Sequence, residues 1–176
     1  MTINIAENTL PLKLDLACGQ TKKDGFIGVD RSSKTDINLD ILKFPWPWAD
    51  NSVDEIYCSH FIEHIPMEYV EHNGREKDLF EAFFDECFRV LKPEGTMSVI
   101  VPCARNNRAF QDPTHRRFIV AETFAYLNRE WRESNKLEHC HGDCNFASNV
   151  VPTTYQEMTL LHPEAQARRF NESWNV

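Results

Sequence analysis

The stretch from residue 76 to residue 102 constrains the fold more than any other part of the sequence. Residues 76–91, EKDLFEAFFDECFRVL, repeat apolar side chains at helical spacing, which predicts an amphipathic helix. The sequence KPEG then ends this helix with a proline and a glycine. Residues 96–102, TMSVIVP, follow as a continuous apolar run, typical of a central strand covered on both faces. A helix that leads into such a strand indicates an α/β protein.

Other short segments complete the predicted pattern of strands and helices. Residues 12–16, 26–30 and 53–60 are predicted as strands, and the sequence DINLD contains a further short one. A short helix is predicted over residues 121–127. Residues 145–151 and 154–161 are predicted as a closing pair of strands. Because no repeat or linker interrupts the chain, we interpret residues 1–176 as a single domain.

The connection between the first two strands bears on the ligand. In LDLACGQTKKDGFIGVD, only six residues separate Gly19 from Phe26, too few for a helix. A dinucleotide site needs Gly-x-Gly-x-x-Gly at the start of a helix, whose N-terminus holds the pyrophosphate. Here Gly19 stands without a second glycine, and Ala17 occupies the place of one. The spacing therefore argues against a nicotinamide cofactor and favours an adenosine cofactor without phosphates, such as S-adenosyl-L-methionine.

The residues that follow the predicted strands suit such a ligand. In α/β sheets the carboxyl ends of the strands share one rim, where ligands bind. Asp30, after the second strand, offers two oxygens to the hydroxyls of a ribose. Asp40 and Ile41 place a polar acceptor beside an apolar side chain, which suits an adenine ring.

In this order and spacing, the sequence resembles class I S-adenosylmethionine-dependent methyltransferases. It is similar to a small subgroup in which the first motif runs directly into the second strand. The matching segments are LDLACGQTKKDGFIGVD, DINLDILKFPWPWADNSVDEIYCSHFIEHI, LFEAFFDECFRVLKPEGTMSVIVP and DPTHRRFIVAETFAYL. The resemblance implies a Rossmann-like sheet, mostly parallel with a closing antiparallel strand, in which the helix after the first strand is shortened or absent.

The resemblance also implies which residues hold the cofactor. The first motif would contact its methionine and ribose parts, the acids after the second and third strands would bind ribose and adenine, and the end of the fourth strand would face the methionine. The implied residues are Asp15, Ala17, Cys18, Gly19, Asp30, Arg31, Asp40, Ile41, Ser59 and His60. The family usually has glycine where this chain has Ala17, and we expect the alanine to be tolerated if its φ is negative.

Histidines are the candidate catalytic residues. In methyl transfer the cofactor supplies the activated methyl group, and the protein aligns the acceptor and excludes water. A hydroxyl or ammonium acceptor also needs a base, for which histidine is the usual choice. The candidates are His60 and His115, whereas we expect His64 to pack against a helix. The DPTH turn around His115 equally suits a structural role, with Asp112 beginning the turn.

Charge and cysteine content bear on whether the protein binds nucleic acid or a metal ion. The net charge of −8 disfavours nucleic acid, because binding phosphates takes a basic face, and the cluster THRRF is small. No apolar run is long enough for a membrane span, and residues 1–16 lack a signal sequence, so we expect a cytoplasmic protein. The cluster HCHGDC lacks the second cysteine pair of a structural zinc site. We interpret it as a polar loop and predict no metal site.

Two functions are compatible with these features. The first is a methyltransferase that acts on a small-molecule acceptor. Because 176 residues leave little chain for a substrate cap, its acceptor site would be shallow or completed by the partner of a homodimer. The alternative is a catalytically inactive subunit that binds S-adenosylmethionine and acts through a partner protein. Formation of S-adenosylhomocysteine distinguishes the two.

Overall fold

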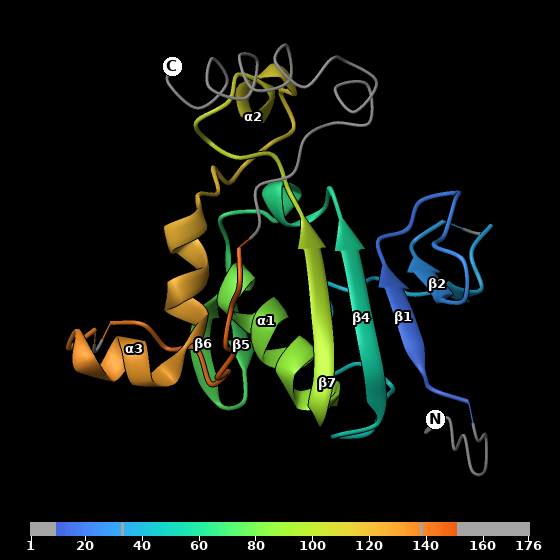
Figure 1. Ribbon diagram of the computed structural model, residues 1–176, viewed down its shortest axis with the longest axis horizontal. Helices are drawn as coiled ribbons and strands as arrows, with labels where there is room; N and C mark the ends of the chain where they lie inside the picture. The colour runs from blue at the N-terminus through green and yellow to red at the C-terminus, as the bar shows by residue number, and fades with distance from the viewer. Residues whose placement is uncertain (1–9, 33, 138, 151–176) are drawn as a thin grey trace, which may run out of the picture.

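The computed structural model describes residues 10–32, 34–137 and 139–150, and its centre is a parallel sheet (Figure 1). The sheet has five strands in the order β3-β2-β1-β4-β7, and every neighbouring pair is parallel. Its strands are β1 (Lys13–Leu16), β2 (Ile27–Asp30), β3 (Ile37–Asn38), β4 (Val53–Ser59) and β7 (Leu91–Ile100). The prediction of an α/β fold with a mostly parallel sheet is confirmed.

The remaining elements lie at the sides and at one end of this sheet. The strands β5 (Tyr69–His72) and β6 (Arg75–Asp78) form a separate antiparallel hairpin that contacts α1 (Leu79–Val90). The short helical elements are η1 (Ile62–His64), α2 (Arg108–Gln111), η2 (Ala121–Leu127) and α3 (Arg129–Ser134). In the described ranges no helix has the length and apolar character that a membrane crossing requires.

Most predicted elements are present, with shifted boundaries. The helix predicted over residues 76–91 begins only at Leu79, because residues 75–78 pair as β6 and the Asp78 side chain accepts a hydrogen bond from the Phe80 amide at 2.8 Å. Residues 121–127 form a 3₁₀ helix. Residues 145–150 carry no strand, and the second predicted closing strand, residues 154–161, lies outside the described residues. Among the described strands, antiparallel pairing occurs in the hairpin alone.

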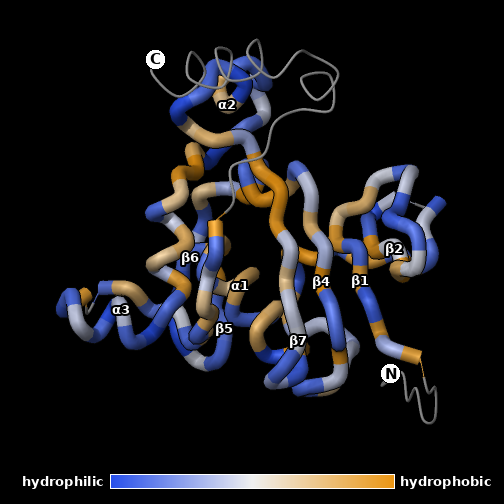
Figure 2. Tube along the Cα trace, in the orientation of Figure 1, coloured by the Kyte–Doolittle hydropathy of each residue, from blue (hydrophilic) through white to orange (hydrophobic). Residues whose placement is uncertain are grey.

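β7 differs from its prediction as a covered central strand. In the described part of the chain it pairs with β4 and forms the edge of the sheet. Thr96, Ser98 and Ile100 on one of its faces are exposed. The end of β7 nearest α2 is nevertheless hydrophobic along the trace (Figure 2). An apolar run thus identified the strand correctly, but the described residues do not cover both of its faces.

The core lies between the sheet and α1. Phe83 and Phe84 of α1 are buried in one cluster with Leu14, Ile56 and Cys58 of the sheet. As the sequence predicts, no helix intervenes between β1 and β2. The connecting loop is held instead by the buried carboxylate of Asp15, whose Oδ2 accepts a hydrogen bond from the Lys23 amide at 2.7 Å.

A buried carboxylate at Glu86 joins α1 to the loop that precedes β4. Its Oε1 accepts hydrogen bonds from the Trp46 amide and from Nη2 of Arg89, both at 2.6 Å. Its Oε2 lies 3.4 Å from Nε2 of His72. Burial alone would raise the pKa of Glu86, but the hydrogen bonds from His72, Arg89 and Trp46 outweigh it and lower the pKa from 4.5 to about 2.

This lowered pKa predicts a loss of stability in acid. Because the pKa of Glu86 is lower in the folded chain, its stabilising contribution is present above pH 4.5 and disappears as the pH falls from 4.5 towards 2. A shift of this size corresponds to about 3 kcal/mol. Urea denaturation at pH 6 and at pH 3 measures the loss. It should be smaller in Glu86→Gln than in the wild type, whereas the exposed control Glu94→Gln should keep the full loss. Equal losses in all three proteins would contradict the assignment.

Candidate cofactor and acceptor site

The carboxyl ends of β1, β2, β4 and β7 lie along one edge of the sheet. From β1 the chain adds β2 and β3 on one side, and it then returns to add β4 and β7 on the other side. The strand order therefore reverses between β1 and β4. Open α/β sheets bind their ligands at such a switch point, so the candidate site is the edge where β1 and β4 end.

The turn after β1 is left-handed at two positions. Gly19 has φ +61°, and a Cβ built there would meet no atom within 4 Å, so its backbone is open to a ligand. Ala17 has φ +56°. The condition under which we expected the alanine to be tolerated, a negative φ, is therefore not met, and the left-handed conformation costs a non-glycine residue about 1–2 kcal/mol.

Asp30 holds the turn after β1 to the end of β2. Its Oδ2 accepts a hydrogen bond from the Gly19 amide at 3.1 Å, and its Oδ1 accepts one from the Ser32 amide at 2.8 Å. The two residues that sequence reasoning assigned to the same cofactor are thus in contact. Each carboxylate oxygen has two lone pairs, so Asp30 keeps acceptor capacity for ribose hydroxyls.

Asp15 and Cys18 stabilise the turn from the protein side. Asp15 is 3% exposed and holds the Lys23 amide; burial raises its pKa, an effect opposed by that hydrogen bond. The Cys18 side chain packs against Gly28 of β2, where a Cβ would come within 2.9 Å of the Cys18 Sγ. Burial also raises the pKa of the Cys18 thiol. Asp15 therefore offers little side-chain surface to a cofactor, whereas Cys18 is partly exposed.

The other predicted cofactor residues differ in accessibility. Arg31 is exposed at the end of β2, and Asp40 is partly exposed, with Oδ1 accepting a hydrogen bond from the Leu42 amide at 3.2 Å. Ile41 is only 4% exposed and belongs to the core cluster. Its carbonyl oxygen accepts a hydrogen bond from Nε1 of Trp46 at 3.1 Å. Ile41 therefore offers little side-chain surface to an adenine ring.

The end of β4 is strained at His60. Ser59 is the last residue of the strand, and His60 follows with φ +53° while its amide donates to the Ile100 carbonyl at 2.8 Å. Ala17 and His60 therefore place left-handed, non-glycine backbone at the ends of two adjacent strands. Strain of this kind gathers at functional sites.

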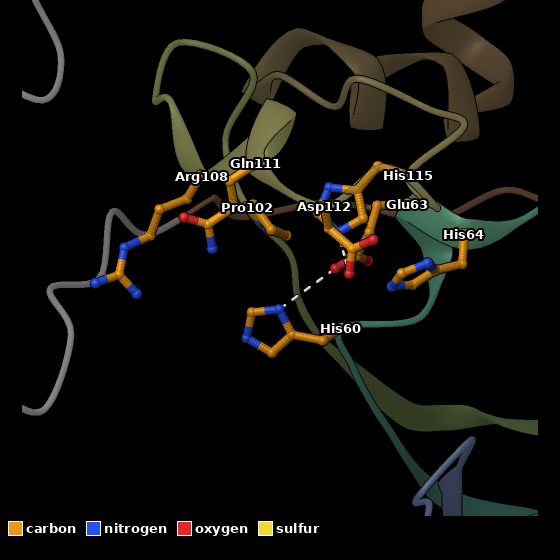
Figure 3. A pocket seen from close by; sticks show the side chains of 8 residues that line it. All are labelled: His60, Glu63, His64, Pro102, Arg108, Gln111, Asp112 and His115. Carbon is orange, nitrogen blue, oxygen red and sulfur yellow. Dashed lines mark ion pairs between the residues drawn. The ribbon is translucent and has the colours of Figure 1, made fainter.

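A pocket of about 290 Å³ opens beside His60 (Figure 3). Its walls come from the end of β4, from η1, from the segment after β7, from α2 and from the loop that follows α2. The lining residues are His60, Glu63, His64, Pro102, Arg108, Gln111, Asp112 and His115. Both predicted catalytic histidines, which are 55 positions apart in the sequence, line this one pocket.

The loop that carries His115 is fixed to η1 by its backbone. The amides of Arg116 and Arg117 donate to the carbonyl oxygen of Glu63 at 2.7 and 3.0 Å. The DPTH turn also forms as the structural interpretation predicts, because Oδ1 of Asp112 accepts hydrogen bonds from the Thr114 amide and hydroxyl. These hydrogen bonds lower the pKa of Asp112. The turn therefore positions His115 in the pocket.

Sequence reasoning missed two members of the pocket, Glu63 and His64. Glu63 is 1% exposed, and Nδ1 of His60 lies 3.3 Å from its Oε1. We expected His64 to pack against a helix. Instead it lines the pocket, and its ring centroid lies 4.7 Å from that of His115. The signal in the sequence was the spacing SHFIEH, in which a glutamate and two histidines fall within five positions.

The cluster HCHGDC is held as a loop against α1. Oδ1 of Asp85 accepts hydrogen bonds from the amides of Asp143 and Cys144 at 2.7 and 2.8 Å. The Asp143 side chain pairs with Lys77, and Cys144 is buried. Hydrogen bonds and an ion pair therefore account for the polar residues at this end of the cluster.

Comparison with known proteins decides the family. Residues 14–99 match the family described as "methyltransferase domain". These residues are a methyltransferase domain. The resemblance to class I S-adenosylmethionine-dependent methyltransferases is thereby confirmed. Among solved structures, a SAM-dependent methyltransferase from Archaeoglobus fulgidus is similar at 17% identity and a TM-score of 0.49, over 95% of this chain and 79% of that one. Among curated proteins, none matches the sequence.

The methyltransferase domain contains the turn after β1, Asp30, and the pocket residues of β4 and η1. The other half of the pocket, from Pro102 to His115, lies beyond the matched residues. The matched residues thus include the edge where β1 and β2 end, and the segment that closes the pocket follows them in the sequence.

Proposed function

We propose that this protein transfers a methyl group from S-adenosylmethionine to an acceptor bound in the pocket beside His60. The observation that carries the proposal is the position of this pocket. It opens at the ends of β4 and β7, next to the turn after β1 in a methyltransferase domain. A cofactor over β1 and an acceptor over β4 would be neighbours.

The residues at the end of β1 and β2 fit this cofactor. Gly19 exposes backbone, and Asp30 retains acceptor capacity for the ribose hydroxyls. With no helix after β1, the site lacks the helix N-terminus that holds a pyrophosphate, which favours a cofactor without phosphates. S-adenosylmethionine brings the activated methyl group when bound, and the protein aligns the acceptor and excludes water.

His60 is the better placed of the two candidate bases. Its Nδ1 lies 3.3 Å from Oε1 of Glu63 without a hydrogen bond between them, and a ring nitrogen of a neutral imidazole can remove a proton from an acceptor bound in the pocket. Its side chain is about half exposed at the pocket. His115 is nearly buried, and its Nδ1 lies 2.7 Å from the Ala109 carbonyl oxygen. We therefore assign the base to His60.

A small molecule is the acceptor that the surface favours. The net charge of −8 opposes binding of a nucleic-acid backbone, and the pocket has the volume of a small-ligand site. The six cysteines are free thiols, which agrees with a reducing, cytoplasmic setting.

Calorimetric titration of the purified protein with S-adenosylmethionine and with S-adenosylhomocysteine tests the proposal. Micromolar binding of both is expected, followed by release of S-adenosylhomocysteine on incubation with a panel of small hydroxyl and amine acceptors. Binding of NADH without either of these ligands would overturn the cofactor assignment. Binding of S-adenosylmethionine with no turnover on any acceptor would instead support the inactive, partner-dependent subunit.

A further inference from the structure

We propose that Glu63, His64 and His115 bind a divalent transition-metal ion at the wall of the pocket. Each residue offers one ligand atom, and these atoms lie within 4.8 Å of one another. Two ligands of one zinc ion are roughly 3.4 Å apart, given metal–ligand bonds of about 2.0–2.2 Å. Side-chain shifts of about an ångström therefore bring the three atoms around one ion.

The first argument is the unpaired carboxylate. Glu63 is 1% exposed, and neither of its oxygens accepts a hydrogen bond. The nearby Nδ1 of His60 lies at ion-pair distance from Oε1, without the geometry of a hydrogen bond. A buried carboxylate without donors is costly unless a cation compensates its charge. A metal ion on Glu63 would supply that cation.

The second argument is the orientation of the two imidazoles. Nδ1 of His115 lies 2.7 Å from the Ala109 carbonyl oxygen, so this nitrogen donates and Nε2 holds the lone pair. Nδ1 of His64 lies 3.1 Å from the Thr114 hydroxyl, which itself donates to Asp112 at 2.7 Å. The single hydrogen of that hydroxyl is already donated to Asp112, so the hydroxyl oxygen can only accept from His64, and Nδ1 of His64 must be the donor. In both residues the lone pair is therefore on Nε2, which in His115 lies 4.0 Å from Oδ2 of Asp112.

These hydrogen bonds match the surroundings of metal-bound histidines. Such histidines almost always donate their second nitrogen to a carbonyl, carboxylate or similar group, which fixes the tautomer and the ring. Here two imidazoles and one carboxylate come together in the pocket wall (Figure 3). Two imidazoles and one carboxylate suit Zn²⁺, Fe²⁺, Co²⁺ or Mn²⁺, and three protein ligands leave a position open towards the pocket.

The sequence led us to expect no metal site, and that expectation was based on the HCHGDC loop. The present proposal differs from it. Among the residues that the structure describes, it is the pocket cluster and not this loop that brings three ligand atoms together. Binding of the ion does not depend on methyl transfer, so the two proposals can fail separately.

Titration of the metal-free full chain with Zn²⁺, followed by calorimetry, and with Co²⁺, followed by its visible absorption, tests the site. One equivalent of each ion should bind. Glu63→Gln and His115→Ala should each lower the affinity at least 100-fold, and Thr114→Val, which removes the partner of His64, about 10- to 100-fold. The matched control His141→Ala, in the HCHGDC loop, should bind as the wild type does.

Thermal melts with and without Zn²⁺ provide a second readout. The ion should raise the melting temperature of the wild type and of His141→Ala, because it binds the folded chain, but not that of Glu63→Gln. Glu63→Gln should fold without metal, since the change removes an uncompensated buried charge. The proposal is overturned if the wild type binds no ion, or if His141→Ala abolishes binding while His115→Ala retains it.

Discussion

Replacing Lys77 by alanine is expected to lower the free energy of unfolding by about 3–5 kcal/mol. The Lys77 side chain is fully buried, and its Nζ lies 2.6 Å from Oδ2 of Asp85 and also pairs with Asp143. Burial would lower the pKa of Lys77, but the hydrogen bonds to Asp143 and Asp85 outweigh it and raise the pKa. Without the ammonium group, the buried Asp85 carboxylate loses its cation. Urea denaturation at neutral pH measures the loss.

Lys92→Ala is the matched control for this change. Nζ of Lys92 lies at the same distance, 2.6 Å, from Oδ1 of Asp54, but both side chains are substantially exposed. Exposed pairs contribute roughly 0–1 kcal/mol, so Lys92→Ala should be nearly neutral. If the two variants lose equal stability, burial does not decide the strength of the Lys77 pair.

The second large effect is expected at Asp30. Asp30→Ala should weaken binding of S-adenosylhomocysteine at least tenfold, because hydrogen bonds to a charged group contribute roughly 1.5–3 kcal/mol each. The structure adds a second cause, since the same carboxylate holds the Gly19 amide at 3.1 Å. Calorimetric titration measures the affinity, and a thermal melt checks that the variant is folded.

Asp36→Ala controls for loss of an acid from the same region. The carboxylate of Asp36 accepts a hydrogen bond from the Gly28 amide at 2.8 Å and pairs with Lys22, but it has no part in the proposed cofactor site. This variant should keep the affinity of the wild type. Unchanged affinity in a folded Asp30→Ala would mean that the ribose binds elsewhere.

The contact between the turn after β1 and the end of β2 was predictable because it depends on short-range order along the chain. Gly19 lies in the turn after β1 and Asp30 is the last residue of β2, and neighbouring parallel strands end at the same edge of a sheet. The contact between these residues at 3.1 Å agrees with that expectation. The left-handed backbone conformation of Ala17 was not predictable in the same way, because the identity of a residue does not determine the sign of its φ. The turn imposes the left-handed conformation.

The sequence by itself determined the α/β alternation, the absence of a helix between β1 and β2, and the acids at the strand ends, since each follows from the local pattern of apolar and turn residues. The tertiary structure alone decided the pocket. Glu63 and His115 are 52 positions apart, and they meet because backbone amides after His115 bind the Glu63 carbonyl. Nearly every residue has a backbone amide, so the pattern of side chains does not predict which amide will bind a carbonyl oxygen far away in the sequence.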